Sequence, residues 1–239
     1  NLTWETLEGL AKHNGPLRKP PAYIAEFDAA YPLELTTHAS VEAQAAAIAD
    51  DIAYNNHDLD DGLRAGLFSL EEAAALPLFG EALADARNAA PDAPPDRLAS
   101  EAIRRVINRM VNDVVAEARR RLSALNPRSA ADVRAAKAPV VVFSEPMLRA
   151  NRVVREFLYG RMYRHWRVNR TAQKSKRVVQ VLFTLLHGGP DMLPGEWQVR
   201  AGEPGTAATA HAVCDYIAGM TDRFALDEHR RLTDPTIPG

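Results

Sequence analysis

Apolar residues recur at helical spacing along most of this chain. The clearest case lies between residues 97 and 125, where an apolar side chain returns at every third or fourth position over about seven turns. These positions are Ile103, Ile107, Met110, Val114, Ala118, Leu122 and Leu125. Asn126 and Pro127 follow, and both residue types commonly end a helix. The pattern predicts a long amphipathic helix that is the scaffold of the second half of the chain.

Start signals divide the remaining chain into further helices. Residues that commonly cap a first helical turn stand before four other patterns: Thr3, Ser40, Ser69 and Ser129. Glu72 follows Ser69 at the spacing of a capping box, and Pro77 limits that helix to a short one. More helices are expected over residues 147–164, 170–186 and 207–232. The sequence therefore predicts an all-α fold.

Three segments do not follow the helical pattern. Residues 20–37 contain Pro20, Pro21 and Pro32, and predict an extended connection. Residues 140–143 read Val-Val-Val-Phe, which is either a short strand or an extended buried link. Residues 91–95, Pro-Asp-Ala-Pro-Pro, predict a break between two domains, 1–90 and 96–239.

Composition places few limits on function. The chain has 239 residues, of which 46% are hydrophobic and 25% charged, and its net charge is -2. These values are ordinary for a soluble globular protein. No apolar run approaches the ~20 residues that cross a bilayer, and the amino end carries no signal-peptide pattern, so we expect a cytoplasmic protein without a membrane partner. The single cysteine, Cys214, suits a reducing compartment and is expected to pack inside an apolar helical pattern.

The polar residues of the segment 49–61 are the most informative in the chain. Asp50, Tyr54 and Asp58 recur at every fourth position and therefore share one face of a helix. Asp50 offers a metal an oxygen ligand, Tyr54 can bond a hydroxyl group, and Asp58 can accept from a sugar. The other interpretation is an acidic, solvated helix face. Spacing alone leaves both interpretations open.

A basic stretch lies between residues 149 and 177. Its members are Arg149, Arg152, Arg155, Arg161, Arg164, Arg167, Arg170, Lys174, Lys176 and Arg177, interleaved with Phe157, Tyr159, Tyr163 and Trp166. Arginine beside aromatic rings can bind single-stranded nucleic acid or a regulatory nucleotide. Alternatively, the aromatics belong to the core and the arginines to the outer faces of two helices. Farther on, Asp215 and Asp222 would share a face of one helix, where they either close a pocket or form ion pairs.

Three segments carry a resemblance to a known family. The residues Ala-Asp-Asp-Ile-Ala-Tyr at 49–54, followed by Asp-Leu-Asp-Asp at 58–61, resemble the last metal-ligand helix of the dGTPase-like deoxynucleoside triphosphate triphosphohydrolases, a branch of the HD-domain phosphohydrolases. Residues 1–16 resemble the segment after the catalytic core of that family, and residues 215–225 resemble its C-terminal signature. The resemblance spans nearly the whole chain. It implies a multi-helix HD-domain-like phosphohydrolase fold, with residues 1–90 as the C-terminal part of the catalytic core.

The resemblance also implies roles for four residues. Asp50 matches the fourth protein ligand of a divalent metal ion such as Mg or Mn, while Tyr54 and Asp58 match residues that contact deoxyribose. Lys12 lies where the family has a lysine near the triphosphate. The implied reaction is hydrolysis of a dNTP to a deoxynucleoside and triphosphate, in which the metal lowers the pKa of bound water and polarises the attacked phosphate.

The family's other metal ligands, a histidine and a His-Asp pair, precede the equivalent of Asn1. We therefore expect this chain to be the C-terminal part of a longer protein, to be inactive alone, and to have the N-terminal HD segment as a partner. A homo-oligomer is a further expectation. The rival hypothesis is a non-catalytic helical module that binds a nucleotide or nucleic acid through residues 149–177.

Overall fold

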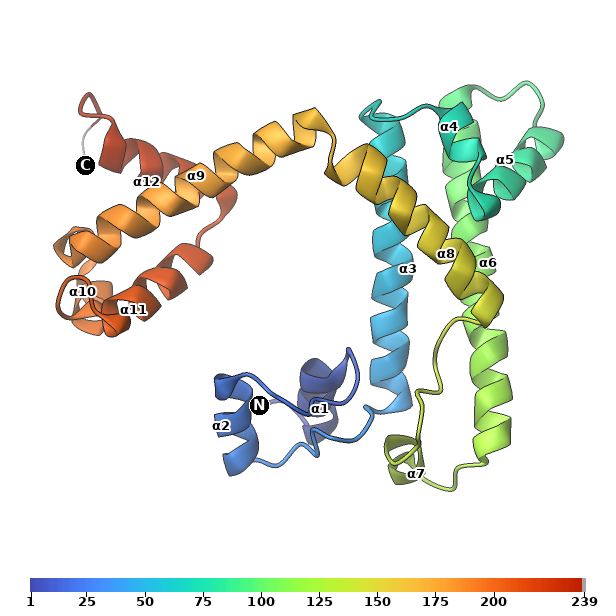
Figure 1. Cartoon of the computed structure of the whole chain (residues 1–239), viewed down its shortest axis with the longest axis horizontal. Helices are drawn as coiled ribbons and strands as arrows, with labels where there is room; N and C mark the ends of the chain where they lie inside the picture. The colour runs from blue at the N-terminus through green and yellow to red at the C-terminus, as the bar shows by residue number, and fades with distance from the viewer. Residues whose placement is uncertain (238–239) are drawn as a thin grey trace. The chain divides into compact units, whose positions relative to one another are not determined.

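Every regular element of this protein is a helix within residues 1–237, which are the residues that the structure, a computed structural model, describes (Figure 1). The prediction of an all-α fold is confirmed. The chain divides into two compact units, residues 1–163 and residues 164 onward. The helices of the first unit are α1 Trp4–Lys12, α2 Ala22–Ala30, α3 Val41–Arg64, α4 Leu70–Ala74, α5 Pro77–Ala89, α6 Pro95–Leu125, α7 Ala130–Arg134, α8 Glu145–Leu158 and the π-helix η1 Tyr159–Tyr163. Those of the second are α9 Trp166–Gly188, the 3-10 helix η2 Pro190–Met192, α10 Gly195–Ala201, α11 Ala207–Ala218 and α12 Asp222–Thr233.

The first unit is built on two long helices, α3 and α6, which lie side by side (Figure 1). Helix α5 packs on α6, and α8 packs on both α3 and α5. The predicted apolar positions of α6 are buried or partly buried against this core, apart from Leu125 at the end of the helix. Phe79, Leu83, Leu59 and Leu158 fill the space between the helices and are almost completely buried. Burial of this apolar surface gives the unit its own hydrophobic core.

The predicted cap residues start the helices where the sequence indicates. The hydroxyl oxygens of Thr3, Ser40, Ser69 and Ser129 each accept a hydrogen bond from the third residue of the following helix. The capping box of Ser69 and Glu72 is confirmed, because each side chain bonds the backbone N–H of the other residue. Asn126 ends α6 in the left-handed conformation, at φ 48°.

Two predictions of local structure are wrong. Residues 20–37 are not extended throughout, because Pro21 precedes the helix α2, and proline is well tolerated next to the first helical turn. Residues 207–232 form two helices rather than one. Gly219 ends α11, and Thr221 starts α12 by accepting a hydrogen bond from the Phe224 N–H. Asp215 and Asp222 therefore lie on different helices and share no face.

The structure decides between the two alternatives at residues 140–143, and it corrects the prediction for Cys214. Residues 140–143 are the extended buried link, since the structure shows no strand there and Val140, Val141 and Phe143 are buried. Cys214 is exposed, so its expected packing role is wrong. The neighbouring Ala212 and Val213 face the core instead.

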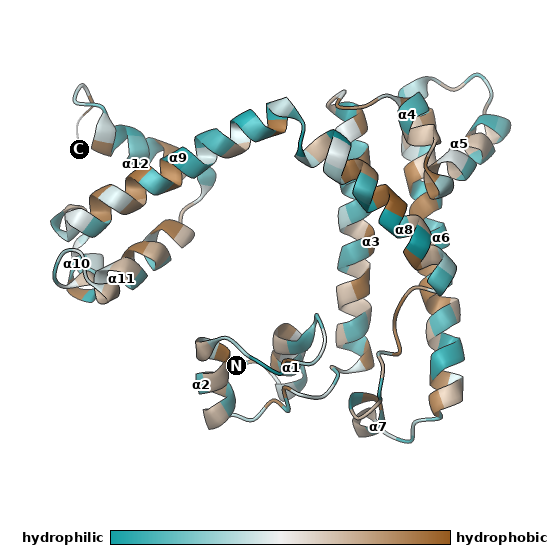
Figure 2. Cartoon of the chain, viewed as in Figure 1, coloured by the Kyte–Doolittle hydropathy of each residue, from teal (hydrophilic) through white to brown (hydrophobic). Residues whose placement is uncertain are grey.

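The second unit is smaller, and the second half of α9 organises it. Helices α11 and α12 pack on α9, and α10 packs on α11. The core of this unit consists of Leu186, Leu193, Ala201, Ala212, Val213 and Tyr216. Only the later turns of α9 contribute to it, which is visible in Figure 2 as a change from hydrophilic to hydrophobic colours along the helix.

The boundary between the compact units lies after Tyr163. The predicted boundary at residues 91–95 coincides with the connection between α5 and α6, two helices that pack closely on one another. The domains 1–90 and 96–239 were predicted by function, as the catalytic part and the C-terminal part of the chain. This division stays a prediction. Among residues 1–237, no helix is long and apolar enough to cross a membrane.

Candidate functional site

Helix α3 positions three of the four predicted site residues. Its start is fixed by the Ser40 cap, and its inner face is anchored by the buried side chains of Ile52 and Leu59. These contacts leave Asp50 and Tyr54 exposed and Asp58 partly exposed. The stripe of Asp50, Tyr54 and Asp58 is therefore an outer face of a rigid, well-packed helix.

Asp50 lines a cavity of about 1200 Å³ in the first unit. The same cavity is lined by Asp51, so the lining alone does not separate the predicted ligand from its neighbour. Other walls come from α1, the amino half of α3, the end of α7 and the link at 139–142; they include Gly9, Lys12, Ser40, Arg134 and Val141. Lys12 and Asp50 thus lie in the walls of one cavity. Tyr54 and Asp58 lie beyond this lining, one and two turns farther along α3.

A buried glutamine holds the cavity wall together. The Gln44 Oε1 atom accepts hydrogen bonds from the backbone N–H groups of Val140 at 2.8 Å and Val141 at 3.1 Å. Its Nε2 atom donates to the Ala39 carbonyl at 2.9 Å. One side chain thus satisfies two backbone donors that no strand partner satisfies, and it ties the link to α3.

The sugar-side residues meet a tyrosine that the sequence analysis did not assign to the site. The hydroxyl of Tyr163 donates a hydrogen bond to Asp58 Oδ2 and also interacts with the side chain of Tyr54. Burial, together with these two interactions, raises the pKa of Tyr163 well above its ordinary value. Tyr163 is therefore a neutral donor at physiological pH. The only sequence signal for it was its place among the aromatics of the basic stretch.

Lys12 is completely buried, and its ammonium group is fully engaged. The Nζ atom lies 2.8 Å from Glu8 Oε2 and donates to the Glu34 carbonyl at 3.3 Å and to Thr37 Oγ1 at 3.0 Å. Its aliphatic stem and charge also lie near the indole ring of Trp4, with Nζ 5.8 Å from the ring centroid. In this structure, Lys12 is part of the cavity wall and presents no free charge to the cavity.

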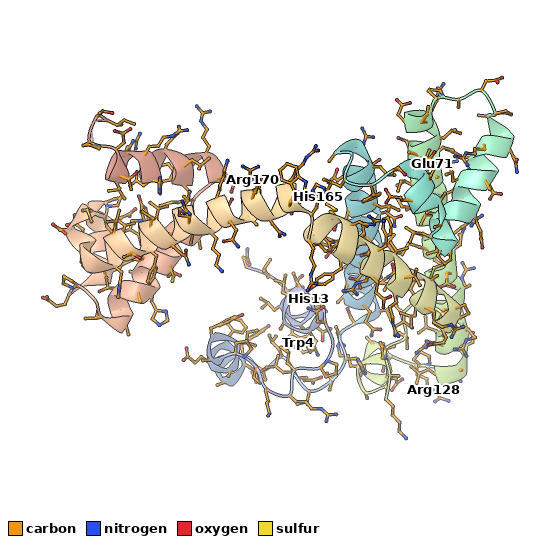
Figure 3. The ribbon with its side chains drawn as sticks, turned by 45° about the horizontal axis from the view of Figure 1, so that its top comes forward. Trp4, His13, Glu71, Arg128, His165 and Arg170 are labelled. Carbon is orange, nitrogen blue, oxygen red and sulfur yellow. The ribbon has the colours of Figure 1, made fainter. Side chains whose placement is uncertain are left out.

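Glu8 is the centre of this buried cluster. Besides Lys12, it accepts from Arg134 through Nε at 2.9 Å and Nη2 at 2.7 Å, and from the Ser40 backbone N–H at 3.2 Å. Burial opposes ionisation of Glu8, but the hydrogen bonds from Arg134 and Lys12 outweigh it and hold its pKa below the ordinary value. The carboxylate therefore joins α1 to α7 and to the start of α3. Trp4 closes the cluster with its ring 4.8 Å from the Arg134 guanidinium (Figure 3 labels Trp4).

The described residues do not form a metal site by themselves. Among residues 1–237, no group of three or more His, Cys, Asp or Glu side chains is arranged to hold a metal ion. A catalytic divalent metal needs several protein ligands. Within the described residues, Asp50 is therefore not part of such a group.

The basic stretch divides into two parts with different surroundings. In the first unit, Arg149 pairs with Glu145 at 3.5 Å and Arg161 pairs with Glu72 at 2.8 Å. Phe157 packs edge-on against Phe68 in the core, with the ring centroids 4.9 Å apart. This part agrees with the packing interpretation.

The part of the basic stretch that lies on α9 does not agree with the packing interpretation. Trp166 is 58% exposed, and the guanidinium groups of Arg167 and Arg170 lie over its ring at 5.5 and 5.6 Å (Figure 3 labels Arg170). No acidic residue occurs in α9. The first three turns of this helix therefore carry an aromatic ring and several cations on an exposed surface.

Buried asparagines are a second feature that the sequence analysis missed. Asn56 Nδ2 donates to the Ile52 carbonyl at 2.8 Å and lies 3.2 Å from Met110 Sδ. Asn55 Nδ2 donates to Asn151 Oδ1 at 3.3 Å. These contacts fix α3 against α6 and α8, and so fix the outer face of α3. In the sequence they are indistinguishable from the polar residues of a solvated turn.

Comparisons with known proteins agree with the family resemblance of residues 1–16, 49–61 and 215–225. Residues 141–231 match a family described as a phosphohydrolase-associated domain. A deoxyguanosinetriphosphate triphosphohydrolase-like protein of Parvibaculum lavamentivorans is 53% identical over 98% of this chain and 61% of its own length. Proteins of the same name from Azorhizobium caulinodans and Caulobacter vibrioides are 51% and 50% identical, over 99% and 97% of this chain and 62% and 60% of their own lengths.

Identity at this level over nearly all of a chain reflects common ancestry, and it confirms the resemblance stated from the sequence. It extends through both compact units, so neither unit is an unrelated addition. The chain is a homologue of the deoxyguanosinetriphosphate triphosphohydrolase-like proteins, and it spans about three-fifths of the length of these relatives.

Proposed function

We propose that this chain is the part of a metal-dependent dNTP triphosphohydrolase that supplies one metal ligand and the sugar side of the substrate pocket. The reaction is hydrolysis of a dNTP, dGTP-like in type, to a deoxynucleoside and triphosphate. The observation that carries the proposal is the outer face of α3, where Asp50 lies beside a large cavity and Tyr54 and Asp58 continue the same face. The names of the relatives support the substrate class.

Asp50 is the proposed metal ligand. A bound divalent ion such as Mg or Mn would polarise a phosphate and lower the pKa of a bound water. The remaining ligands are proposed to come from the part of the protein that the relatives have outside the matched region. For this reason the chain alone is proposed to be inactive.

Tyr54 and Asp58, with Tyr163, are proposed to bind the deoxyribose. Tyr163 already holds the Asp58 carboxylate in place and touches Tyr54, so the three side chains form one connected group. A neutral phenol and a carboxylate together offer both a donor and an acceptor to a sugar hydroxyl. Because Tyr163 keeps its proton at physiological pH, this pairing does not change with moderate changes of pH.

Lys12 is the proposed contact on the phosphate side, on the strength of the resemblance. In this structure its Nζ atom is bound to Glu8, so a direct contact with a phosphate requires Lys12 to leave Glu8. Within the same cavity wall, Arg134 supplies a second positive charge. The same lining contains Glu5, Glu42, Asp50 and Asp51, so acidic side chains outnumber the cations there, which favours a cation such as the proposed metal ion.

The test compares two neighbouring aspartates in the full-length protein. In Asp50→Asn, we expect metal content and triphosphate release from dNTPs to collapse, because a ligand is lost. Asp51→Asn is the matched control, since it removes the same charge from the same cavity wall and should retain metal. Metal content is measured by elemental analysis after dialysis. Retention of metal in Asp50→Asn together with its loss in Asp51→Asn would reverse the assignment.

A second candidate function is binding of a regulatory nucleotide or single-stranded nucleic acid by the first turns of α9. The specific observation is that Arg170, Lys174 and Arg177 follow Trp166 along one face of α9, about one helical turn apart. Helix α9 contains no acidic residue. The spacing of these three side chains, about 4.5–6 Å along the axis, suits successive phosphates, and an exposed indole suits base stacking.

Fluorescence anisotropy with a labelled single-stranded oligonucleotide tests this candidate. Each lost phosphate contact should reduce the slope of log affinity against log salt by about 0.7. The variant Arg170→Gln/Lys174→Gln is compared with Arg104→Gln/Arg120→Gln, which removes two exposed arginines from α6. Equal affinity and equal salt slopes in both variants would exclude α9 as the binding surface.

A further inference from the structure

Helix α2 presents an aromatic stripe to solvent. None of its nine residues is buried, although it is one of the most apolar helices of the chain (Figure 2). Tyr23, Phe27 and the helix-ending Tyr31 are 72%, 44% and 43% exposed. Tyr23 and Phe27 are four residues apart on the helix, so they lie along one face, and the ring of Tyr31 contacts that of Phe27. Three aromatic side chains in one exposed row are unusual for a surface without a partner, because each ring can bury ~150–250 Å².

The stripe belongs to a rigid element. The Asp28 Oδ1 atom accepts from the Leu33 N–H at 2.7 Å, which fixes the turn after the helix. The indole N–H of Trp4 donates to the Pro32 carbonyl at 2.8 Å, which ties this turn to α1. The rings of Phe27 and Tyr31 pack edge to face with centroids 6.0 Å apart. The aromatic surface is therefore preformed, which lowers the entropic cost of binding a partner.

The location of the stripe indicates what covers it. About two-fifths of the length of the relatives lies outside the region that this chain matches. Under the proposed function, that part carries the remaining metal ligands and must reach the Asp50 cavity, one wall of which is α1 with Gly9 and Leu10. Helix α2 is bound to α1 through Trp4, so a segment that reaches this cavity can also contact α2.

We infer that Tyr23, Phe27 and Tyr31 are the docking face for the segment of the full-length protein that carries the other metal ligands. The inference rests on the proposed function for the identity of the occupant. The chemistry of the stripe calls for an apolar groove or helix face on that segment, because aromatic rings are the anchors that contribute most to such interfaces. Polar contacts are expected at the rim, where Glu26 is exposed.

Thiol labelling of the full-length protein tests the inference. In a background with Cys214→Ser and no other cysteine, Tyr23→Cys and Phe27→Cys are compared with Ala25→Cys, and circular dichroism verifies that each variant is folded. Ala25 is also exposed but projects about 200° away on the same helix. We expect maleimide to modify the two stripe positions at least about tenfold more slowly than Ala25→Cys under native conditions, and all three equally in urea, because a thiol in an interface reacts only after local opening.

Two results would overturn the inference. Equal native rates at the three positions would show that no partner covers the stripe. If the stripe positions become reactive when dilution dissociates an oligomer, as followed by light scattering, the occupant is a second copy of the chain instead. The labelling needs neither metal nor substrate. Failure of the proposed function, seen as Asp50→Asn retaining metal and activity, is therefore distinguishable from failure of this interface.

Discussion

Replacing Glu8 with glutamine should strongly destabilise the first unit. Glu8 is 0% exposed and accepts hydrogen bonds from Lys12, Arg134 and the Ser40 backbone. The amide of glutamine has nearly the same shape, but it carries no charge and turns an NH₂ group toward one of these donors. Glu8→Gln therefore leaves two cations in a buried cluster without their counter-ion.

The expected cost is about 3–5 kcal/mol, the usual result of removing one partner from a buried ion pair. Domains of this size have unfolding free energies of about 5–15 kcal/mol, so the loss is a large fraction of the total. Two features of the Glu8 cluster predict a loss of about 3–5 kcal/mol. The Arg134 guanidinium makes a forked contact with the carboxylate, and water cannot replace the lost charge at a fully buried position.

Hydrogen-exchange mass spectrometry of the 1–239 chain measures the effect separately in each compact unit. A loss of 3–5 kcal/mol lowers the protection of the most stable amides in the first unit by roughly 100- to 5000-fold, since each 1.4 kcal/mol is tenfold. Peptides from the second unit are the internal control. Glu101→Gln is the matched variant, because Glu101 also accepts from two arginines but is partly exposed, and we expect little change there.

The pH dependence has a definite sign. Since the pKa of Glu8 is lowered in the folded state, its ionised form stabilises the protein at pH values above the ordinary glutamate pKa of about 4.3. That contribution is lost as pH falls below this value and through the lowered pKa. The difference in stability between wild type and Glu8→Gln should therefore be full at pH 7 and shrink in acid. A loss below about 1 kcal/mol at pH 7, or a difference that grows in acid, would refute the reasoning.

Three further predictions concern the site and the core. Tyr54→Phe should weaken transition-state binding by about 1–3 kcal/mol, which would lower kcat/KM for dNTPs in the full-length protein and leave its metal content unchanged. If kcat/KM and the preference for dNTP over rNTP both stay the same, the sugar-side role of Tyr54 is wrong. The purified 1–239 chain should be folded by circular dichroism but release no triphosphate from dNTPs in excess Mn or Mg, and robust release would contradict the account of the missing ligands. Leu59→Ala should lower the unfolding free energy by about 2–5 kcal/mol in urea titrations, whereas Leu10→Ala, at an exposed position, should change it much less.

The sequence predicted the helices well because their signals are local. The caps at Ser40 and Ser69 and the left-handed stop at Asn126 act within one turn, so the residues involved are neighbours in the sequence. The prediction was wrong where composition was misread, as at α2, where the nearby prolines outweighed the apolar pattern of residues 22–30. The break at Gly219 was also missed, because the apolar pattern continues on both sides of it.

The site was only partly readable from the sequence. The common face of Asp50, Tyr54 and Asp58 on α3 follows from helical periodicity, so the sequence predicted that these three candidate residues lie together. Tyr163 approaches Asp58 from 105 positions away, and such a contact has no local signal. The burial of Lys12 depends in the same way on Arg134, which reaches Glu8 across 126 positions.

The packing of α3 has a consequence for how the proposed enzyme measures its substrate. Asp50 and Asp58 are eight residues apart on one continuous helix, so their separation along the axis is fixed at about 12 Å. Buried Asn55, Asn56 and Leu59 prevent this helix from sliding or turning. Under the proposed roles of Asp50 and Asp58, the helix would set the distance between the metal end and the sugar end of the nucleotide. A point substitution on the outer face of α3 would leave the distance between Asp50 and Asp58 unchanged. Inserting one residue between the two aspartates would lengthen that distance by about 1.5 Å and rotate Asp58 by about 100° relative to Asp50.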